Sequence, residues 1–336
     1  MLNIFEAIKR MNAVCSPSGS EADIADIIRG LCAGYADEIS ADAMGNLTAL
    51  KKGTGRGKRI MLSAHMDSVG FIVTHIDEKG FIRFSNLGGL TPALLLGVPV
   101  KFKNGTRGVI FKDGKPEIKD LKLHELYIDI GAGSKEEAEK QVAVADSAVY
   151  AAETYMVTGD VIVSPYLDDR LGCAVLIDVL MCMREPVNDV YFVFSAQEEL
   201  GLRGARTAAF GIDPEIGIAV DVTRTGDTPN PAGVMETYLG KGAAIKVMDS
   251  SLICSPEIVS GLEECARSNG IEYQLEVLVA GGTDAGAMQL TRGGVHAGAV
   301  SIPTRYIHSP SEMASLRDAE AAARLIREYV SREIEL

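Results

Sequence analysis

The sequence predicts an α/β protein in which helices cover a mostly parallel sheet and a small β-rich domain is inserted. Strand and helix patterns alternate in the first third and the last half of the chain, whereas closely spaced short strands occupy the region between. Such alternation is typical of a parallel sheet covered by helices. With 336 residues, the chain is long enough for one large domain or two smaller ones.

The elements of the α/β part are indicated by apolar periodicity. Continuous apolar runs indicate buried strands, and apolar residues three or four positions apart indicate helices. Pro256 and Gly270 delimit one helix at its two ends. In chain order, we expect a helix within 1–14, a helix after the capping-box pattern Ser18–Glu21, strands at 59–64, 190–195 and 216–220, a helix at 255–270, strands at 277–280 and 297–302, and a helix at 314–333.

The inserted part has short β-like segments separated by Gly, Pro, Asn and Asp. These segments lie at 70–75, 81–84, 98–102, 108–111 and 126–130, followed by one short helix at 135–141 that Ser134 caps. Closely spaced strands with turn residues between them predict a small β-rich domain. The expected boundaries are therefore 1–68 and 164–336 for the α/β domain, and 69–163 for the insertion.

The composition is that of a soluble globular protein, with 47% hydrophobic and 24% charged residues. No segment approaches the roughly 18–20 apolar residues of a membrane span. Glu6, Lys9 and Arg10 interrupt the apolar N-terminus, so we expect no signal peptide. The six scattered cysteines form no CxxC pair, which favours a reduced, cytoplasmic setting. The net charge of −13 argues against nucleic acid and anionic membranes as partners.

Five short segments carry the residues suited to chemistry, and each follows or nearly follows a predicted strand. They are Ala64–Asp67, Leu167–Arg170, Gln197–Glu199, Val220–Val222 and Ile307–Pro310. In an open α/β sheet, ligands bind at the carboxyl ends of the strands. We therefore expect these segments, which lie far apart in the sequence, to converge on one rim.

This convergence would crowd acidic side chains into one pocket. The carboxylates concerned are Asp67, Asp168, Glu198, Glu199 and Asp221. Two unit charges 4 Å apart repel by about 4 kcal/mol at an effective dielectric constant near 20. One bound cation relieves this repulsion, and two relieve it better. Histidine with carboxylate is the ligand set preferred by zinc and its neighbours.

The segments also suggest roles, some of which the residues leave open. His65 and Asp67 point to the same side of a strand end, so Asp67 either partners a metal-bound imidazole or holds another group in place. Of Glu198 and Glu199, one could bind metal while its neighbour stays free as a base. Two metals about 3.5–4 Å apart could share a water, lower its pKa and polarise a peptide carbonyl.

Taken together, the chain resembles the tetrahedral-aminopeptidase family of co-catalytic metallopeptidases, which includes glutamyl aminopeptidases and members labelled cellulases. The resemblance extends from near residue 3 to near residue 330. Its motifs include Gly45-Asn46, Gln197–Ala205, Gly281–Gly286 and Ile302–Pro310. The family's activity implies removal of N-terminal residues from peptides.

The resemblance implies a role for each site residue. His65 and His308 would bind one metal each, Asp168 would bridge both, and Glu199 and Asp221 would complete one site each, with Glu198 as general base and Asp67 orienting His65. The two divalent ions would be zinc, with cobalt and manganese as alternatives. Residues 69–163 would form a dimerisation domain, whose dimers often assemble into a hollow tetrahedral dodecamer. Ser68 departs from the family, because many members carry an acidic residue there.

Simpler explanations exist for each segment alone. A lone His-x-Asp is usually a surface or core pair, Asp168-Asp169 could cap a helix, and Glu198-Glu199 could be a solvated pair. One binuclear site explains all of them together. Other functions also remain open: a binuclear-metal amidohydrolase or deacylase, a glycosidase, or a non-catalytic scaffold.

Four further residues are weaker candidates. Thr283 and Asp284 could shape the substrate pocket or simply form a turn. Arg305 could meet an acidic side chain or a peptide carboxylate, or stabilise a loop. We expect His296 to make a hydrogen bond in the core.

Overall fold

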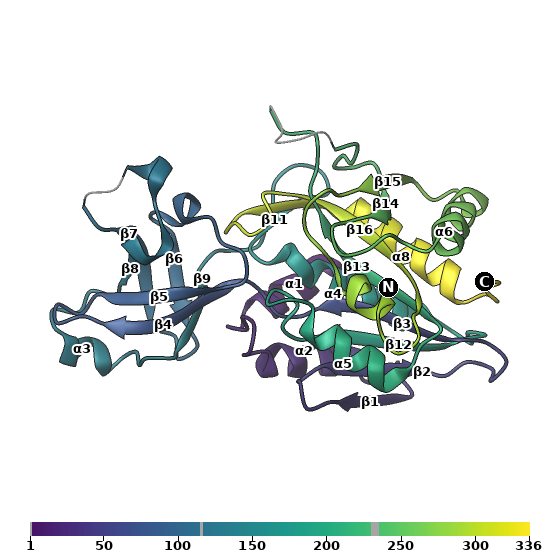
Figure 1. Cartoon of the computed structure of the whole chain (residues 1–336), viewed down its shortest axis with the longest axis horizontal. Helices are drawn as coiled ribbons and strands as arrows, with labels where there is room; N and C mark the ends of the chain where they lie inside the picture. Colours follow the sequence, from purple (N-terminus) through teal and green to yellow (C-terminus); the bar gives the residue numbers. More distant parts are fainter. Residues whose placement is uncertain (1, 115–116, 230–234) are drawn as a thin grey trace.

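The computed structural model describes residues 2–114, 117–229 and 235–336. It has an α/β part built on an 11-stranded sheet and, at one side of it, a closed six-stranded barrel (Figure 1). The four central strands of the large sheet are parallel, and the strands outside them are added mostly in antiparallel fashion. The predicted fold class is confirmed.

The large sheet runs in the order β1-β2-β12-β3-β13-β16-β17-β11-β10, and β14 joins it at β16 and carries β15. The strands are β1 (Glu38–Ala41), β2 (Leu47–Lys51), β3 (Arg59–His65), β10 (Tyr155–Met156), β11 (Val161–Ser164), β12 (Asp189–Ser195), β13 (Ile216–Thr223), β14 (Ala243–Met248), β15 (Tyr273–Val277), β16 (His296–Arg305) and β17 (Glu312–Ser315).

Helices cover both faces of this sheet. They are α1 (Ile4–Asn12), α2 (Ala22–Cys32), α4 (Leu167–Cys182), α5 (Arg203–Ile212), α6 (Pro256–Asn269), α7 (Asp284–Gln289) and α8 (Leu316–Val330). The core on one face is shared by α1, α2, α4, α6 and α8, and the smaller core on the other by α5 and α7. Among the described residues, no helix is both long and apolar enough to cross a membrane.

The barrel closes in the order β4-β5-β8-β7-β6-β9. Its elements are β4 (Gly70–Ile76), β5 (Ile82–Leu87), η1 (Pro92–Leu95), β6 (Pro99–Phe102), β7 (Arg107–Lys112), η2 (Ile118–Asp120), η3 (Leu123–Glu125), β8 (Leu126–Asp129), α3 (Lys135–Glu139) and β9 (Ser147–Tyr150). The expected cap of the short helix is present, because the Ser134 side chain accepts a hydrogen bond from the Glu137 amide.

The insertion is shorter than the predicted 69–163. Its last barrel strand ends at Tyr150, and the following strands β10 and β11 belong to the large sheet, where β11 pairs with β17. These two strands are short and are separated by a turn with Gly159, so in sequence they look like the barrel strands before them. The pairing partner that assigns them to the large sheet lies about 150 residues away, at 312–315.

Two local predictions are wrong. Ser18–Glu21 is not a capping box, because the Glu21 side chain instead accepts the amides of Gly19 (2.7 Å) and Gln197 (3.1 Å). The strand expected at 277–280 lies earlier, at Tyr273–Val277. The helix α4 was indicated only by the possible cap Asp168-Asp169, because its residues from Leu167 to Leu180 are all buried and it lacks the polar face that reveals a helix.

Candidate metal centre

The five predicted segments meet at the carboxyl edge of the central parallel strands. His65 ends β3, Asp221 lies near the end of β13, Glu198 and Glu199 follow β12, His308 follows β16, and Asp168 lies in the first turn of α4. These residues line one cavity of about 330 Å³. The expected convergence on one rim is therefore observed.

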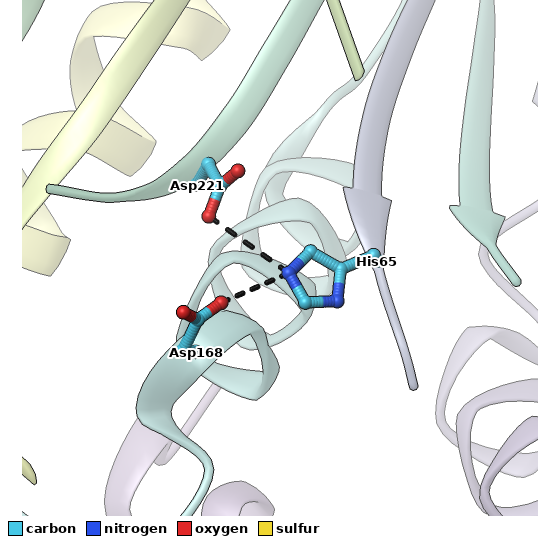
Figure 2. A group of neighbouring side chains, drawn as sticks. All are labelled: His65, Asp168 and Asp221. Carbon is cyan, nitrogen blue, oxygen red and sulfur yellow. Dashed lines mark hydrogen bonds and ion pairs between the residues drawn. The ribbon is translucent and has the colours of Figure 1, made fainter. Parts of the chain in front are cut away.

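One group of possible ligands consists of His65, Asp168 and Asp221 (Figure 2). The Nε2 atom of His65 lies 2.9 Å from Asp168 Oδ1 and 4.0 Å from Asp221 Oδ1. Both acidic side chains are largely buried, and the imidazole is only 2% exposed. The three side chains thus offer one nitrogen and two oxygens to a common point.

A second group consists of Asp168, Glu199 and His308. The Nε2 atom of His308 lies 3.2 Å from Asp168 Oδ2 and 3.2 Å from Glu199 Oε1. The Oε1 atom of Glu199 is buried and accepts no hydrogen bond from the described residues. An orphaned buried carboxylate oxygen facing an imidazole and a second carboxylate is what a cation site requires.

Asp168 belongs to both groups, with Oδ1 toward His65 and Oδ2 toward His308. Burial by itself would raise the pKa of this carboxyl group, but hydrogen bonds from His308 and His65 lower the pKa below its ordinary value. An ionised carboxylate with one oxygen directed to each group has the geometry of a bridge between two cations.

The other titratable groups of the two ligand groups have raised pKa values. Burial raises the pKa of Asp221 well above its usual range, and nearby Asp168 raises it further. Burial also raises the pKa of Glu199. Burial lowers the pKa of His308, but its contacts with Asp168 and Glu199 raise that pKa overall, to about 11. Groups that hold protons this tightly fit a place where divalent cations replace the protons.

Glu198 stands apart from both groups while lining the same cavity. Its Oε2 atom lies 3.9 Å from His65 Nε2. Burial raises the pKa of Glu198 well above its ordinary value. The nearby His65 lowers this pKa in part, and the charge of Asp221 raises it further. A carboxyl group of raised pKa beside the possible ligands is suited to accept and return a proton.

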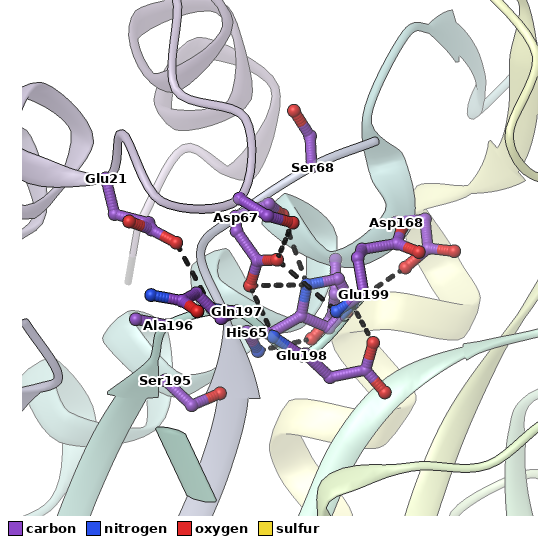
Figure 3. A network of polar contacts seen from close by, with 12 residues as sticks. Glu21, His65, Asp67, Ser68, Asp168, Ser195, Ala196, Gln197, Glu198 and Glu199 are labelled. Carbon is purple, nitrogen blue, oxygen red and sulfur yellow. Dashed lines mark hydrogen bonds and ion pairs between the residues drawn. The ribbon is translucent and has the colours of Figure 1, made fainter. Parts of the chain in front are cut away.

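Asp67 is fully buried next to the segment that carries Glu198 and Glu199 (Figure 3). Its carboxylate accepts the backbone amides of Glu198 (3.0 Å) and Glu199 (3.3 Å) and the hydroxyl of Ser18 (2.6 Å). The Nδ1 atom of His65 lies 3.1 Å from the Asp67 backbone oxygen and 3.5 Å from its carboxylate. Asp67 therefore contacts His65 and also fixes the segment that carries both glutamates.

Glu312 was not identified from the sequence. This glutamate of β17 is 1% exposed, and its two oxygens accept the backbone amides of His308 (2.7 Å) and Asp168 (3.0 Å). A carboxylate four residues after His308 was the available signal. Its targets are backbone groups, however, and these leave no mark in the sequence.

Several other candidates lie outside the ligand groups. Ser68 is buried and points away from the acidic cluster in Figure 3. Arg305 forms a two-pronged ion pair with Asp227, at 2.9 and 2.8 Å, so of its proposed partners it meets an acidic side chain. Asp284 accepts the hydroxyls of Ser63 and Ser195 and is not among the residues that line the cavity. His296 is exposed, so the core hydrogen bond expected for it is wrong.

Gly281 and Gly282 line the cavity, whereas the neighbouring Thr283 does not. Asp169 behaves as a structural residue. Its carboxylate accepts the amide of His65 (3.2 Å) and caps α4 through the amide of Gly172 (3.1 Å).

The fold matches that of a solved TET aminopeptidase from a marine-sediment archaeon, Thaumarchaeota archaeon SCGC AB-539-E09 (34% identity, TM-score 0.94 over 98% of this chain and 96% of its own), and with the family match this makes the chain a peptide-hydrolysing enzyme. In particular, it belongs to the M42 peptidase family, because the sequence pattern described as M42 glutamyl aminopeptidase matches residues 45–325.

Individual relatives cover nearly the whole chain. A protein from Acetivibrio thermocellus is 48% identical over 98% of both chains. The lysyl aminopeptidase of Pyrococcus furiosus is 35% identical over 96% of this chain and 95% of its own. A solved structure of the Pyrococcus horikoshii TET1 peptidase, which assembles into a tetrahedron or a large octahedral shell, is 33% identical, with a TM-score of 0.87 over 99% of this chain and 100% of its own.

Proposed function

We propose that this chain is a metal-dependent aminopeptidase that uses two divalent ions to remove the N-terminal residue of a peptide. The observation that carries the proposal is Asp168, whose two oxygens face two separate imidazoles, His65 and His308. Membership of an aminopeptidase family supports the same function.

The ligand set of each ion follows from the two groups. His65, Asp168 and Asp221 would hold one ion, and Asp168, Glu199 and His308 the other. Zinc suits nitrogen and oxygen ligands of this kind, and cobalt and manganese have overlapping demands. When bound, the ions supply Lewis acidity, which polarises the peptide carbonyl and makes a water molecule more acidic.

Glu198 is the general base in this proposal. Its carboxylate lines the cavity without belonging to a ligand group. A carboxylate oxygen in this position accepts a proton from the attacking water, and the carboxyl group then returns the proton to the leaving amine. The raised pKa of Glu198, which burial causes, favours retention of the proton between these two steps.

The substrate side of the cavity is partly apolar. Leu202, Val222, Leu278 and Ile307 line it beside the acidic rim. Membership of a family described as aminopeptidases, with a lysyl aminopeptidase among the relatives, supports an aminopeptidase over a deacylase.

We also propose a homo-oligomer in which the barrel forms the dimer contact. Large apolar side chains are exposed on the barrel, among them Leu94 (54%), Val109 (43%), Phe111 (51%), Ile118 (58%) and Val144 (59%). Exposed apolar patches commonly mark protein–protein contacts. The assembly of the P. horikoshii relative supports a closed particle.

The six free cysteines suit a reducing, cytoplasmic location.

The decisive experiment compares substrates and metals together. Aminoacyl chromogenic substrates, the same substrates with an acetylated amine, and a soluble glucan are tested before and after chelation, and after zinc, cobalt or manganese is restored. We expect hydrolysis of the free-amine substrates only, lost on chelation and regained with metal. Preference for acetylated substrates would indicate a deacylase, and glucan hydrolysis that survives chelation would indicate a glycosidase.

A further inference from the structure

The inserted barrel touches the proposed metal centre directly. Between β5 and η1, its chain passes Glu199 and His308 with two consecutive glycines, Gly88 and Gly89. A Cβ atom on Gly88 would lie 2.8 Å from Glu199 Oε2 and 3.1 Å from Glu199 Cβ. A Cβ atom on Gly89 would lie 3.2 Å from His308 Nδ1. The backbone of this segment is therefore in contact with two proposed ligands.

A second barrel contact reaches His308 from β9. The hydroxyl of Tyr150 donates a hydrogen bond to the backbone oxygen of His308 at 3.0 Å, and Tyr150 is only 1% exposed. The Tyr150 ring stacks on Tyr166, with ring centres 5.5 Å apart and planes 6° from parallel. Tyr166 lies two residues before Asp168, so barrel contacts approach all three members of the second ligand group.

The first ligand group has a different environment. His65 and Asp221 lie on the central strands β3 and β13 of the large sheet. The three atoms nearest to a Cβ added at Gly88 belong to Glu199 and Val69, and the two atoms within 4 Å of a Cβ added at Gly89 belong to His308. The two ligands that the Gly88-Gly89 segment contacts, Glu199 and His308, are thus the two that belong to the second group alone.

We propose that the inserted barrel positions the second metal site, with Gly88 and Tyr150 as its positioning residues. Because Gly88 has no side chain, the barrel backbone can approach Glu199 closely. The hydroxyl of Tyr150 holds the backbone of His308 in place through its hydrogen bond. The proposal rests on the binuclear site proposed above. It gives the barrel a role within the catalytic centre in addition to any role in assembly.

Gly88→Ala and Tyr150→Phe test this proposal. The first adds one methyl group against Glu199, and the second removes only the hydroxyl that contacts His308. Gly97→Ala is the matched control, because Gly97 is also a barrel glycine with φ +78°, against +79° for Gly88, and a Cβ atom there would meet nothing within 4 Å. Both alanines would therefore have the same unfavourable positive φ, and only the alanine at 88 would contact the site.

The readout is metal content and metal affinity, measured on each full-length variant by elemental analysis and by competition with a chelating dye. We expect wild type and Gly97→Ala to bind two zinc ions. In Gly88→Ala and Tyr150→Phe, the ion of the second group should dissociate at least about tenfold more readily, while the ion of the first group is retained. A loss of this size is typical when a group that orients a ligand is disturbed. Light scattering should give the same particle mass for all four proteins.

The outcomes separate the two proposals. Two ions bound with unchanged affinity in both Gly88→Ala and Tyr150→Phe would overturn the role of the barrel, and so would an equal loss of both ions. Failure of the wild-type protein itself to bind metal would instead overturn the proposed function.

Discussion

The carboxylate of Glu312 accepts the backbone N–H of His308 at 2.7 Å, and its other oxygen accepts that of Asp168 at 3.0 Å. One buried side chain therefore fixes two residues that lie about 140 positions apart in the sequence and that share the second ligand group.

We predict that Glu312→Gln weakens metal binding. An amide offers one acceptor oxygen where the carboxylate offers two, so one backbone N–H loses its partner, which typically destabilises a protein by about 1–3 kcal/mol. Metal affinity should fall roughly 10–100-fold, as for other groups that orient metal ligands. Titration with zinc measures the change, and Glu320→Gln, an exposed change on α8, is the control. Unchanged affinity would show that His308 and Asp168 hold their positions without Glu312.

Glu198→Gln should abolish turnover and leave both metals bound. The amide preserves the shape of the side chain but accepts no proton from water, and loss of a general base typically lowers kcat by about 10²–10⁴. Steady-state kinetics and elemental analysis on the same sample give the two readouts, again with Glu320→Gln beside it. Parallel loss of metal and activity would mean that Glu198 is a ligand.

The stability of the metal-free protein should decrease as the pH rises. The pKa of His308 is about 11 in the folded protein, above the ordinary value of 6.5, because its contacts with Asp168 and Glu199 outweigh burial. The folded state therefore holds this proton more tightly than the unfolded state. The resulting stabilisation is complete below about pH 6.5 and is lost progressively towards pH 11.

Bound metal should remove most of this pH dependence, because the ligands are then already deprotonated. Thermal unfolding at about pH 6.5, 8 and 9.5, with zinc and after chelation, measures the difference. His308→Gln should flatten the curve of the chelated protein, whereas the exposed His296→Gln should not. Parallel curves with and without zinc would contradict the assignment of His308 as a ligand.

Phe111→Asp should reduce the size of the assembly. Phe111 is 51% exposed on β7 of the barrel, and a charge there would oppose burial in a dimer contact. Phe210→Asp is the matched control, since Phe210 is 59% exposed but lies on α5 of the α/β part. Light scattering should show smaller particles for the first variant only. Equal particle mass in both would place the dimer contact elsewhere.

The sequence was most informative where one residue pattern carries both the structure and the chemistry. The apolar run 59–64 predicts a buried strand, and His65 directly at its end is well placed for a ligand at the sheet edge. The same reasoning led to Glu198 and Glu199 after β12 and to Asp221 on β13. All of these side chains line the cavity in the structure.

The sequence was least informative where structure depends on distant partners. The helix α4 is buried on every side, so its apolar residues show no helical period. Strands β10 and β11 are assigned to the large sheet only by their pairing with β17. Glu21 and Glu312 act on backbone amides of remote segments, and such contacts cannot be inferred from one sequence without its fold.

A zinc-soaked crystal examined by anomalous scattering tests the central claim most directly. We expect two zinc peaks, one on each side of Asp168, the first bound by His65 and Asp221 and the second by Glu199 and His308. Absence of zinc between these side chains, with the ion bound elsewhere or not at all, would contradict the account.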